Sequence, residues 1–138
     1  MKREKRRIDR YYRSNNNVYF ACHYHVVWTP KYRRKVLVNG VEKRLEQMAR
    51  AVCQEHQAYI VALGILPDHV HLLVSVDPQF GIHQLIKLIK GRSSFLLRKE
   101  YPQLRAMPSL WTNSYFVSTV GRPTMNVVKH SIEKQKDE

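Results

Sequence analysis

Two histidines stand one residue apart in the stretch LPDHVHLLVSV, residues 66–76, which is otherwise apolar and typical of a buried strand. Residues i and i+2 of a strand point to the same face, so His69 and His71 are expected side by side. Val70 and Leu72 are then expected on the opposite face, against the core. Two neighbouring imidazoles can converge on one metal ion. For an arbitrary pair at this spacing, the alternative is two ordinary half-exposed residues on a sheet surface.

The charge of the chain indicates a polyanionic partner. Its 138 residues include 24 Lys and Arg against 11 Asp and Glu, a formal net charge of +13. Seven basic residues fall within residues 1–13, and four more fall within the segment KYRRK at 31–35. Tyr11, Tyr12 and Tyr32 are interleaved with these charges, as on surfaces that pair phosphate contacts with base stacking. Nucleic acid is therefore the predicted partner, and a solvated lysine-rich surface is the alternative.

The length predicts one domain at residues 18–138, preceded by a basic, flexible arm at 1–17. No run approaches the roughly 18 apolar residues of a membrane span, and the basic start lacks the apolar core of a signal peptide. A cytoplasmic, nucleoid-associated protein is expected. Cys22 and Cys53 match no metal or redox spacing and are expected to be free thiols.

Periodicity and turn residues predict four strands and three helices. The predicted elements are a strand at 18–28, a helix capped by Asn39, strands at 58–66 and 69–76 joined by a turn at Pro67–Asp68, a helix from Ile82 that is broken or eased at Gly91, a strand at 110–120 and a helix at 123–138. The apolar helix positions are Val41, Leu45, Met48 and Val52 in the first helix, Ile82, Leu85, Ile86, Ile89, Phe95 and Leu96 in the second, and Val127, Val128 and Ile132 in the last. The order β-α-β-β-α-β predicts an α+β, ferredoxin-like antiparallel sheet with two helices on one face, plus the C-terminal helix. The other face is expected to stay open for a ligand.

The segment PDHVHLL resembles the HUH motif (histidine, hydrophobic residue, histidine) of nucleases that act on single-stranded DNA. More narrowly, the chain resembles the small single-tyrosine, TnpA-like transposases of bacterial and archaeal insertion sequences. The resemblance covers nearly the whole length. Its blocks are YHVVW at 24–28, PDHVHL at 67–72, IKGRSS at 89–94, LWTNSYFVSTVG at 110–121 and VVKHSIEKQ at 127–135.

The resemblance implies a metal-assisted DNA transposase. In that family two histidines and a glutamine on the last helix bind one Mg²⁺ or Mn²⁺ ion, and the matching positions are His69, His71 and Gln135. A tyrosine on the same helix attacks the scissile phosphate and leaves a 5′-phosphotyrosine bond and a free 3′-hydroxyl. The implied partner is single-stranded DNA with hairpins at the ends of an insertion sequence. A homodimer that exchanges its last helices between active sites is also implied.

The chain departs from the family at the nucleophile, where the tyrosine position reads Ser131. The i, i+4 spacing still predicts Ser131 and Gln135 on one helical face. No tyrosine follows Tyr115, so none on this helix can substitute. Three interpretations stay open: a deliberately inactivated variant, a naturally decayed copy, or attack by Ser131 itself. The third has the least support, because serine is a poorer leaving group than a phenol and only His130 is near enough in sequence to act as a base.

Further contacts are expected from basic and polar residues near the motif. Arg33, Arg34 and Lys35 are predicted phosphate contacts. The resemblance also suggests Lys90 and Arg92 as DNA contacts, with a solvated helix face as the alternative. Asp68 is expected either to orient an imidazole or to form the turn. His25 is expected as a hydrogen-bonded structural residue, with contact to DNA or to the site as the alternative.

Two other functions compete with a transposase that cuts DNA. One is a non-catalytic relic that binds the hairpin without cleaving it. The other is an RNA-binding protein of similar plan, which has less support because the expected open face lacks aromatic residues on the third strand. That face is predicted to carry His69, His71, Leu73 and Ser75.

Overall fold

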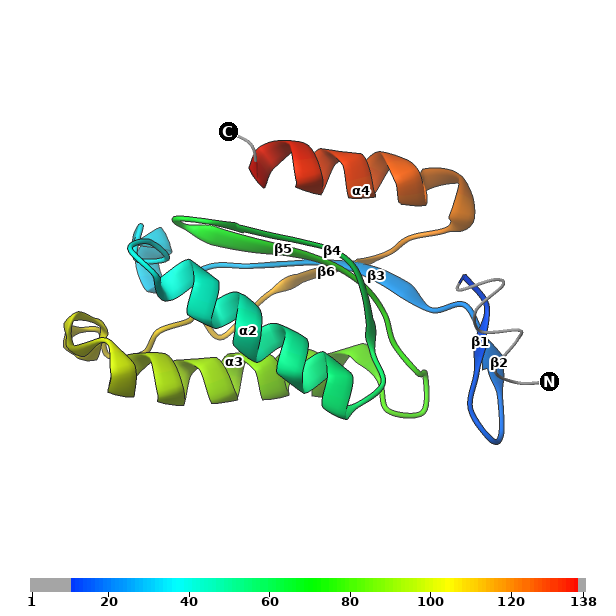
Figure 1. Ribbon diagram of the computed structural model, residues 1–138, viewed down its shortest axis with the longest axis horizontal. Helices are drawn as coiled ribbons and strands as arrows, with labels where there is room; N and C mark the ends of the chain where they lie inside the picture. Colours follow the sequence, from blue (N-terminus) through cyan, green and yellow to red (C-terminus); the bar gives the residue numbers. More distant parts are fainter. Residues whose placement is uncertain (1–10, 137–138) are drawn as a thin grey trace.

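The computed structural model describes residues 11–136, and it confirms the predicted α+β order. The elements of the domain are β3 (His23–Trp28), α2 (Val41–Glu55), β4 (Tyr59–Leu66), β5 (His69–Ser75), α3 (Ile82–Glu100), β6 (Phe116–Thr119) and α4 (Arg122–Lys136). Two short 3₁₀ helices, η1 (Lys31–Arg33) and η2 (Pro102–Ala106), lie in the connections. Figure 1 shows α2 and α3 on one face of the sheet and α4 on the other. In the described part of the chain, no helix is long and apolar enough to cross a membrane.

The sheet has the strand order β4-β5-β3-β6, and every neighbouring pair is antiparallel. This is the order that a ferredoxin-like plan requires, because each β-α-β unit places its second strand beyond a neighbour of the first. The strand β5 therefore lies in the interior of the sheet, between β4 and β3. The predicted β4–β5 hairpin closes through Pro67 and Asp68, since Leu66 pairs with His69.

The main core lies between the sheet and the helices α2 and α3. Alternate residues of the two central strands, Val26 and Trp28 on β3 and Val70 and Leu72 on β5, point into it and are buried. The helix α2 contributes the apolar stripe that its 3.6-residue period predicted, with the buried residues Val41, Leu45, Met48 and Val52. Burial of these side chains is the main stabilising term of the domain.

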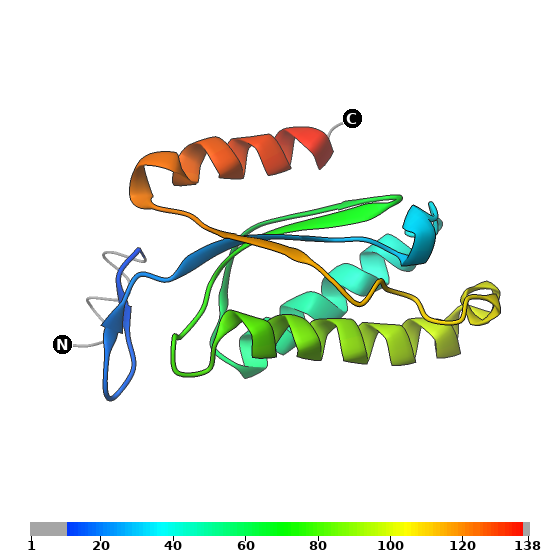
Figure 2. The ribbon, with the colours of Figure 1, turned by 180° about the vertical axis from the view of Figure 1, so that it is seen from behind.

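The expected open face of the sheet is covered by α4, which corrects the prediction. Leu73 and Ser75 of β5, predicted to be exposed, are fully buried. Leu73 packs in a second apolar cluster with Ala62 of β4, Val120 and Ile132 of α4. Figure 2 shows from behind that α4 runs along this face. The cover removes the bare sheet surface that an RNA-binding protein of this plan would use.

The predicted strands at 18–28 and 110–120 are both shorter than expected. Pairing stops at Ala21 and Cys22, which separate a short strand β2 (Tyr19–Phe20) from β3. In the second segment only β6 joins the sheet, apart from an isolated bridge between Pro30 and Trp111. The Lys90 ammonium donates to the carbonyl oxygens of Thr112 at 2.7 Å and Ser114 at 3.3 Å. These bonds hold the segment toward α3, so it cannot pair with β3 throughout.

Two local helix predictions were also wrong. Gly91 does not interrupt α3, because one glycine inside a helix costs stability without breaking it. Gly40, not Asn39, is the residue before α2; its positive φ of 99° suits glycine, and its N–H donates to Glu42 Oε1. Phe95 lies on α3, as predicted, with 69% of its surface exposed.

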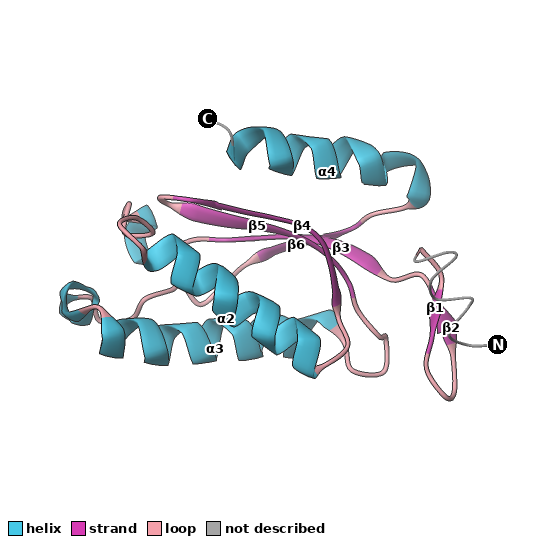
Figure 3. Cartoon of the chain, in the orientation of Figure 1, coloured by secondary structure: helices cyan, strands magenta, loops and turns pink. Residues whose placement is uncertain are grey.

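The first described residues pair with the chain ahead of the domain. A strand β1 (Arg13–Ser14) pairs antiparallel with β2, and we call the segment 11–20 the N-terminal hairpin. Figure 3 shows it beside the end of the main sheet. Residues 1–10 of the predicted arm lie outside the described residues, so the flexibility of the arm stays a prediction. Contacts with the sheet begin ahead of the predicted boundary at residue 18.

The cover provided by α4 can be tested at Leu73. The substitution Leu73→Ala should lower the free energy of unfolding by about 2–5 kcal/mol, because it leaves a cavity between β5 and α4. The matched change Val117→Ala, on the exposed face of β6, should cost less than about 0.5 kcal/mol. Urea denaturation followed by circular dichroism measures both. Equal costs for the two variants would show that α4 does not cover Leu73 in solution.

Candidate functional site

His69 and His71 lie side by side at the beginning of β5, as their spacing predicted. Their ring centroids are 4.7 Å apart and the rings meet edge to face. Both residues are half-buried, whereas Val70 between them is buried in the main core. The two rings therefore lie on the α4 side of the sheet, at the end of β5 next to the β4–β5 turn.

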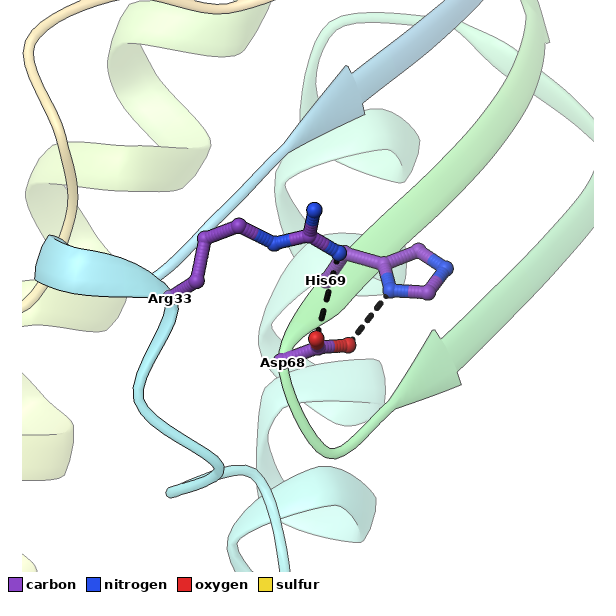
Figure 4. Close-up of polar contacts among 3 residues, drawn as sticks. All are labelled: Arg33, Asp68 and His69. Carbon is purple, nitrogen blue, oxygen red and sulfur yellow. Dashed lines mark hydrogen bonds and ion pairs between the residues drawn. The ribbon is translucent and has the colours of Figure 1, made fainter.

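Asp68 orients the first imidazole. Its Oδ1 lies 2.7 Å from His69 Nδ1, and its Oδ2 accepts a hydrogen bond from Arg33 Nη2 at 3.1 Å (Figure 4). The bond from His69, with the nearby charges of His69 and Arg33, lowers the pKa of the Asp68 carboxyl and outweighs its partial burial. An ionised carboxylate only accepts hydrogen bonds, so His69 must carry its proton on Nδ1. Nε2 of a neutral His69 then keeps a lone pair for a ligand.

His25 of β3 holds the second imidazole. Its Nε2 lies 3.1 Å from His71 Nδ1, and the two rings are nearly parallel. The pKa of His71 is lowered to about 4, mainly by burial and to a smaller extent by the neighbouring His69 and His25. His71 is therefore neutral near pH 7, which is the form that binds a metal. The tautomer in which His71 Nδ1–H donates to His25 Nε2 leaves Nε2 of His71 with its lone pair for a ligand.

The sequence only partly indicated the role of His25. Its hydrogen bond was expected, but its partner was not. Alternation placed His25 on the face opposite Tyr24 and Val26, which is the face of the histidine pair. What the sequence lacked was the register: Val27 pairs with His71 and His25 pairs with Leu73, which sets the two imidazoles diagonally across two strands.

The helix α4 supplies Gln135 and Ser131. Its C-terminal end runs over the sheet toward the β4–β5 turn in both ribbon views (Figures 1 and 2). Gln135 is half-buried, and its Oε1 is buried without a hydrogen-bond partner in the structure. Ser131 is exposed, beside the buried Ile132. The amide of Gln135 thus faces inward with an unsatisfied acceptor, whereas the hydroxyl of Ser131 is open to solvent.

The donors present fit a divalent cation. Within residues 11–136 no group of three His, Cys, Asp or Glu side chains could hold a metal, so a site here needs the amide of Gln135 as well. A buried carbonyl oxygen without a donor is costly unless something compensates it, and a cation would do so. Two imidazoles and an amide oxygen are donors that a divalent ion accepts.

The basic segment 31–35 lies beside this site. Arg33 reaches Asp68, and Arg34 lies over the ring of Tyr32 at 5.8 Å from its centroid. The side chains of Arg34 and Lys35 are exposed. Their role in binding DNA stays a prediction, and their position next to the histidine pair agrees with it.

Lys90 and Arg92 make internal contacts instead. The Lys90 ammonium, half-buried and with a pKa lowered by burial, donates to the carbonyls of the segment that precedes β6. Arg92 forms two hydrogen bonds with the carboxylate of Glu55, which ties α3 to α2. Their DNA contacts stay a prediction. Lys90 also lines a cleft of about 370 Å³ between α3 and the segment 109–115, with Lys87 and Tyr115.

Comparison with known proteins identifies the family. Residues 18–135 match the family model described as "Transposase IS200 like". The chain belongs to this family, whose members are DNA-cleaving and strand-transferring enzymes.

The most informative relative is the ISDra2 transposase TnpA of Deinococcus radiodurans, 35% identical over 121 residues that cover 86% of each chain. The transposase for insertion sequence element IS200 of Salmonella typhimurium is 28% identical over 121 residues, or 83% of this chain and 80% of that protein.

Two solved structures of transposases resemble the fold of this chain. A crystal structure of a Deinococcus radiodurans protein described as a transposase has a TM-score of 0.72 and 33% identity, over 89% of this chain and 97% of that one. A REP-associated tyrosine transposase bound to a REP hairpin shares the fold, with a TM-score of 0.58 and 14% identity over 87% of this chain and 68% of that one.

The tautomer of His69 is a direct test of this geometry. Two-bond ¹H–¹⁵N spectra at about pH 8, where an ordinary imidazole is neutral, should show His69 protonated on Nδ1. The substitution Asp68→Ala removes the acceptor and should shift the proton toward Nε2, while Asp77→Ala should leave the spectrum of His69 unchanged. A proton on Nε2 in the unmodified protein would contradict the assigned hydrogen bond.

Proposed function

We propose that this chain binds hairpin ends of single-stranded DNA at a metal-dependent transposase site made of His69, His71 and Gln135. The main support is the buried, unpartnered Oε1 of Gln135 on the face of the sheet that carries the imidazoles of His69 and His71. Family membership supports action on DNA. The REP hairpin bound by a transposase of the same fold supports a hairpin as the ligand.

A bound Mg²⁺ or Mn²⁺ would polarise a phosphate oxygen as a Lewis acid. In this proposal Nε2 of His69, Nε2 of His71 and Oε1 of Gln135 hold the ion. Asp68 holds the His69 proton on Nδ1, and the proposal takes His71 Nδ1–H as the donor to His25 Nε2, so that both Nε2 atoms carry a lone pair. Arg33, bonded to the same carboxylate as His69, adds a positive charge next to the position of the phosphate.

With Ser131 in the position of the nucleophile, strand cleavage is the step that this chain is least able to perform. A serine hydroxyl is far less acidic than a phenol and needs a base to attack. The adjacent His130 is exposed and points about 100° away around the helix. The exposed position of Ser131 has room for a tyrosine side chain. We therefore propose a protein that binds DNA and metal and does not cut, which corresponds to the inactivated or decayed interpretation.

The proposed assembly is a homodimer in which α4 can move from its own sheet, where it lies in this structure, to complete the partner's site. Two features support it: Gly121 forms the joint between β6 and α4, and α4 contacts the sheet through a small apolar cluster. The four residues of the edge strand β6 are exposed, including the apolar Phe116 and Val117. The proposed location is the cytoplasm, in association with the nucleoid.

The cleavage proposal is tested with a labelled single-stranded hairpin end and Mn²⁺. The unmodified chain should bind the strand without cutting it, whereas Ser131→Tyr should cleave it and become covalently attached to its 5′ end. Removal of a nucleophile commonly costs several orders of magnitude in rate. The double variant Ser131→Tyr, His71→Ala should be inactive. Covalent attachment of DNA to Ser131 in the unmodified chain would contradict the proposal.

The basic segment is tested by the salt dependence of DNA binding. Arg34→Gln and Lys35→Gln should each weaken binding and reduce the slope of log affinity against log salt by about 0.7–0.9, the loss of one phosphate contact. Lys43→Gln, an equal charge change at an exposed site on α2, should leave the slope unchanged. Fluorescence anisotropy of labelled DNA at several salt concentrations measures this slope. Identical slopes in all three variants would place the DNA elsewhere.

A further inference from the structure

The first residue of α4 is held by two aromatic rings of the N-terminal hairpin. The Arg122 guanidinium lies over the ring of Tyr11 at 4.4 Å and over that of Tyr12 at 5.4 Å. The two tyrosines meet edge to face at 5.0 Å. A guanidinium over an aromatic face is attracted by the ring quadrupole, and its planar shape adds stacking.

The stack continues into the sheet. The ring of Tyr11 lies parallel to that of His23 at 4.6 Å, and His23 is buried on β3. Arg122, Tyr11 and His23 thus form successive layers from the start of α4 to a central strand. The backbone nearby is also fixed, because Val120 N–H donates to the His23 carbonyl at 2.9 Å.

The hairpin that carries the tyrosines is anchored independently. Arg13 Nη1 donates to the carbonyl and the hydroxyl oxygens of Ser75 on β5, at 3.0 and 2.9 Å, and Nη2 donates to the Gln57 carbonyl. Asn15 donates to the carboxylate of Asp77 just after β5. Each anchor joins the hairpin to a residue more than forty positions away, so Tyr11 and Tyr12 are presented from a fixed base.

Apart from the aromatic stack, the first turn of α4 makes few buried contacts. Gly121 and Arg122 are exposed; the apolar contacts of α4 begin at the partly buried Met125 and Val128 and reach full burial only at Ile132, nearly three turns beyond Arg122. A helix that pivots at Gly121 would carry Gln135 and Ser131 with it. The aromatic stack is placed where it resists that pivot.

We propose that Tyr11, Tyr12 and Arg122 are positioning residues, which clamp the start of α4 and so set the place of Gln135 over the histidine pair. The clamp itself is independent of the proposed function. Its effect on the metal site rests on that function, because it assumes that Gln135 is a ligand.

Hydrogen exchange of the full chain, without DNA or metal, tests the clamp. Arg122→Gln and Tyr11→Ala should each raise the exchange rates of α4 amides about fivefold to tenfold, because detachment of the helix becomes easier, and should leave the amides of α2 unchanged. Tyr11→Phe keeps the aromatic face and should keep the protection. Arg50→Gln, an equal charge change on α2, should have no effect on α4.

Mn²⁺ titration of the same variants separates the two proposals. Weaker Mn²⁺ binding by Arg122→Gln, with Tyr11→Phe unchanged, supports the link from the clamp to the site. A failure of the unmodified chain to bind Mn²⁺ would overturn the proposed metal site and leave the clamp intact. Unchanged α4 exchange in both Arg122→Gln and Tyr11→Ala would overturn the clamp, whatever the metal result.

Discussion

β5 is buried on both faces along most of its length, and this constraint decides where polar chemistry can occur in the molecule. Val70, Leu72 and Val74 face α2 and α3, while Leu73 lies under α4 and Ser75 is buried beneath Arg13 of the N-terminal hairpin. Only the first residues of the strand leave half-buried polar side chains. His69 and His71 occupy that place, where the protein partly shields them from water and still leaves them accessible to a ligand.

Partial burial has a direct electrostatic consequence. It lowers the pKa of His71, and the nearby imidazoles reinforce the effect, so the ring stays neutral and keeps a donor pair of electrons. Asp68 and His25 each bond to Nδ1 of one imidazole, so Nε2 of each ring is not used by these two contacts. The β4–β5 turn therefore places the two imidazoles at the edge of the hydrophobic layers, and the two hydrogen bonds orient them there.

The sequence predicted the fold well, because its turns and its two periodicities agree with each other. The order of strands and helices followed from the turn residues and the two periodicities, and the shared face of His69 and His71 followed from strand alternation. The cover over Leu73 could not be predicted, because the stripe of Val128 and Ile132 on α4 shows that the helix packs, but not on which surface. The His25–His71 contact depends on strand register, which one sequence does not specify.

The contacts of the basic residues were equally hard to predict from the sequence. Composition identified an excess of positive charge, yet Lys90 and Arg92 use theirs inside the domain, on backbone carbonyls and on Glu55. Arg34 and Lys35 leave their side chains exposed beside the site. A count of charges cannot separate these two uses, because the separation depends on which groups the fold brings within hydrogen-bonding distance.

The solvent-facing position of Ser131 has an evolutionary meaning. Its neighbour Ile132 anchors the helix, whereas residue 131 contributes nothing to that packing. An exchange between tyrosine and serine there alters reactivity while the architecture stays as it is. On the proposed function, one codon change at this position would switch strand cleavage off or on, while the fold that binds the DNA ends would be kept.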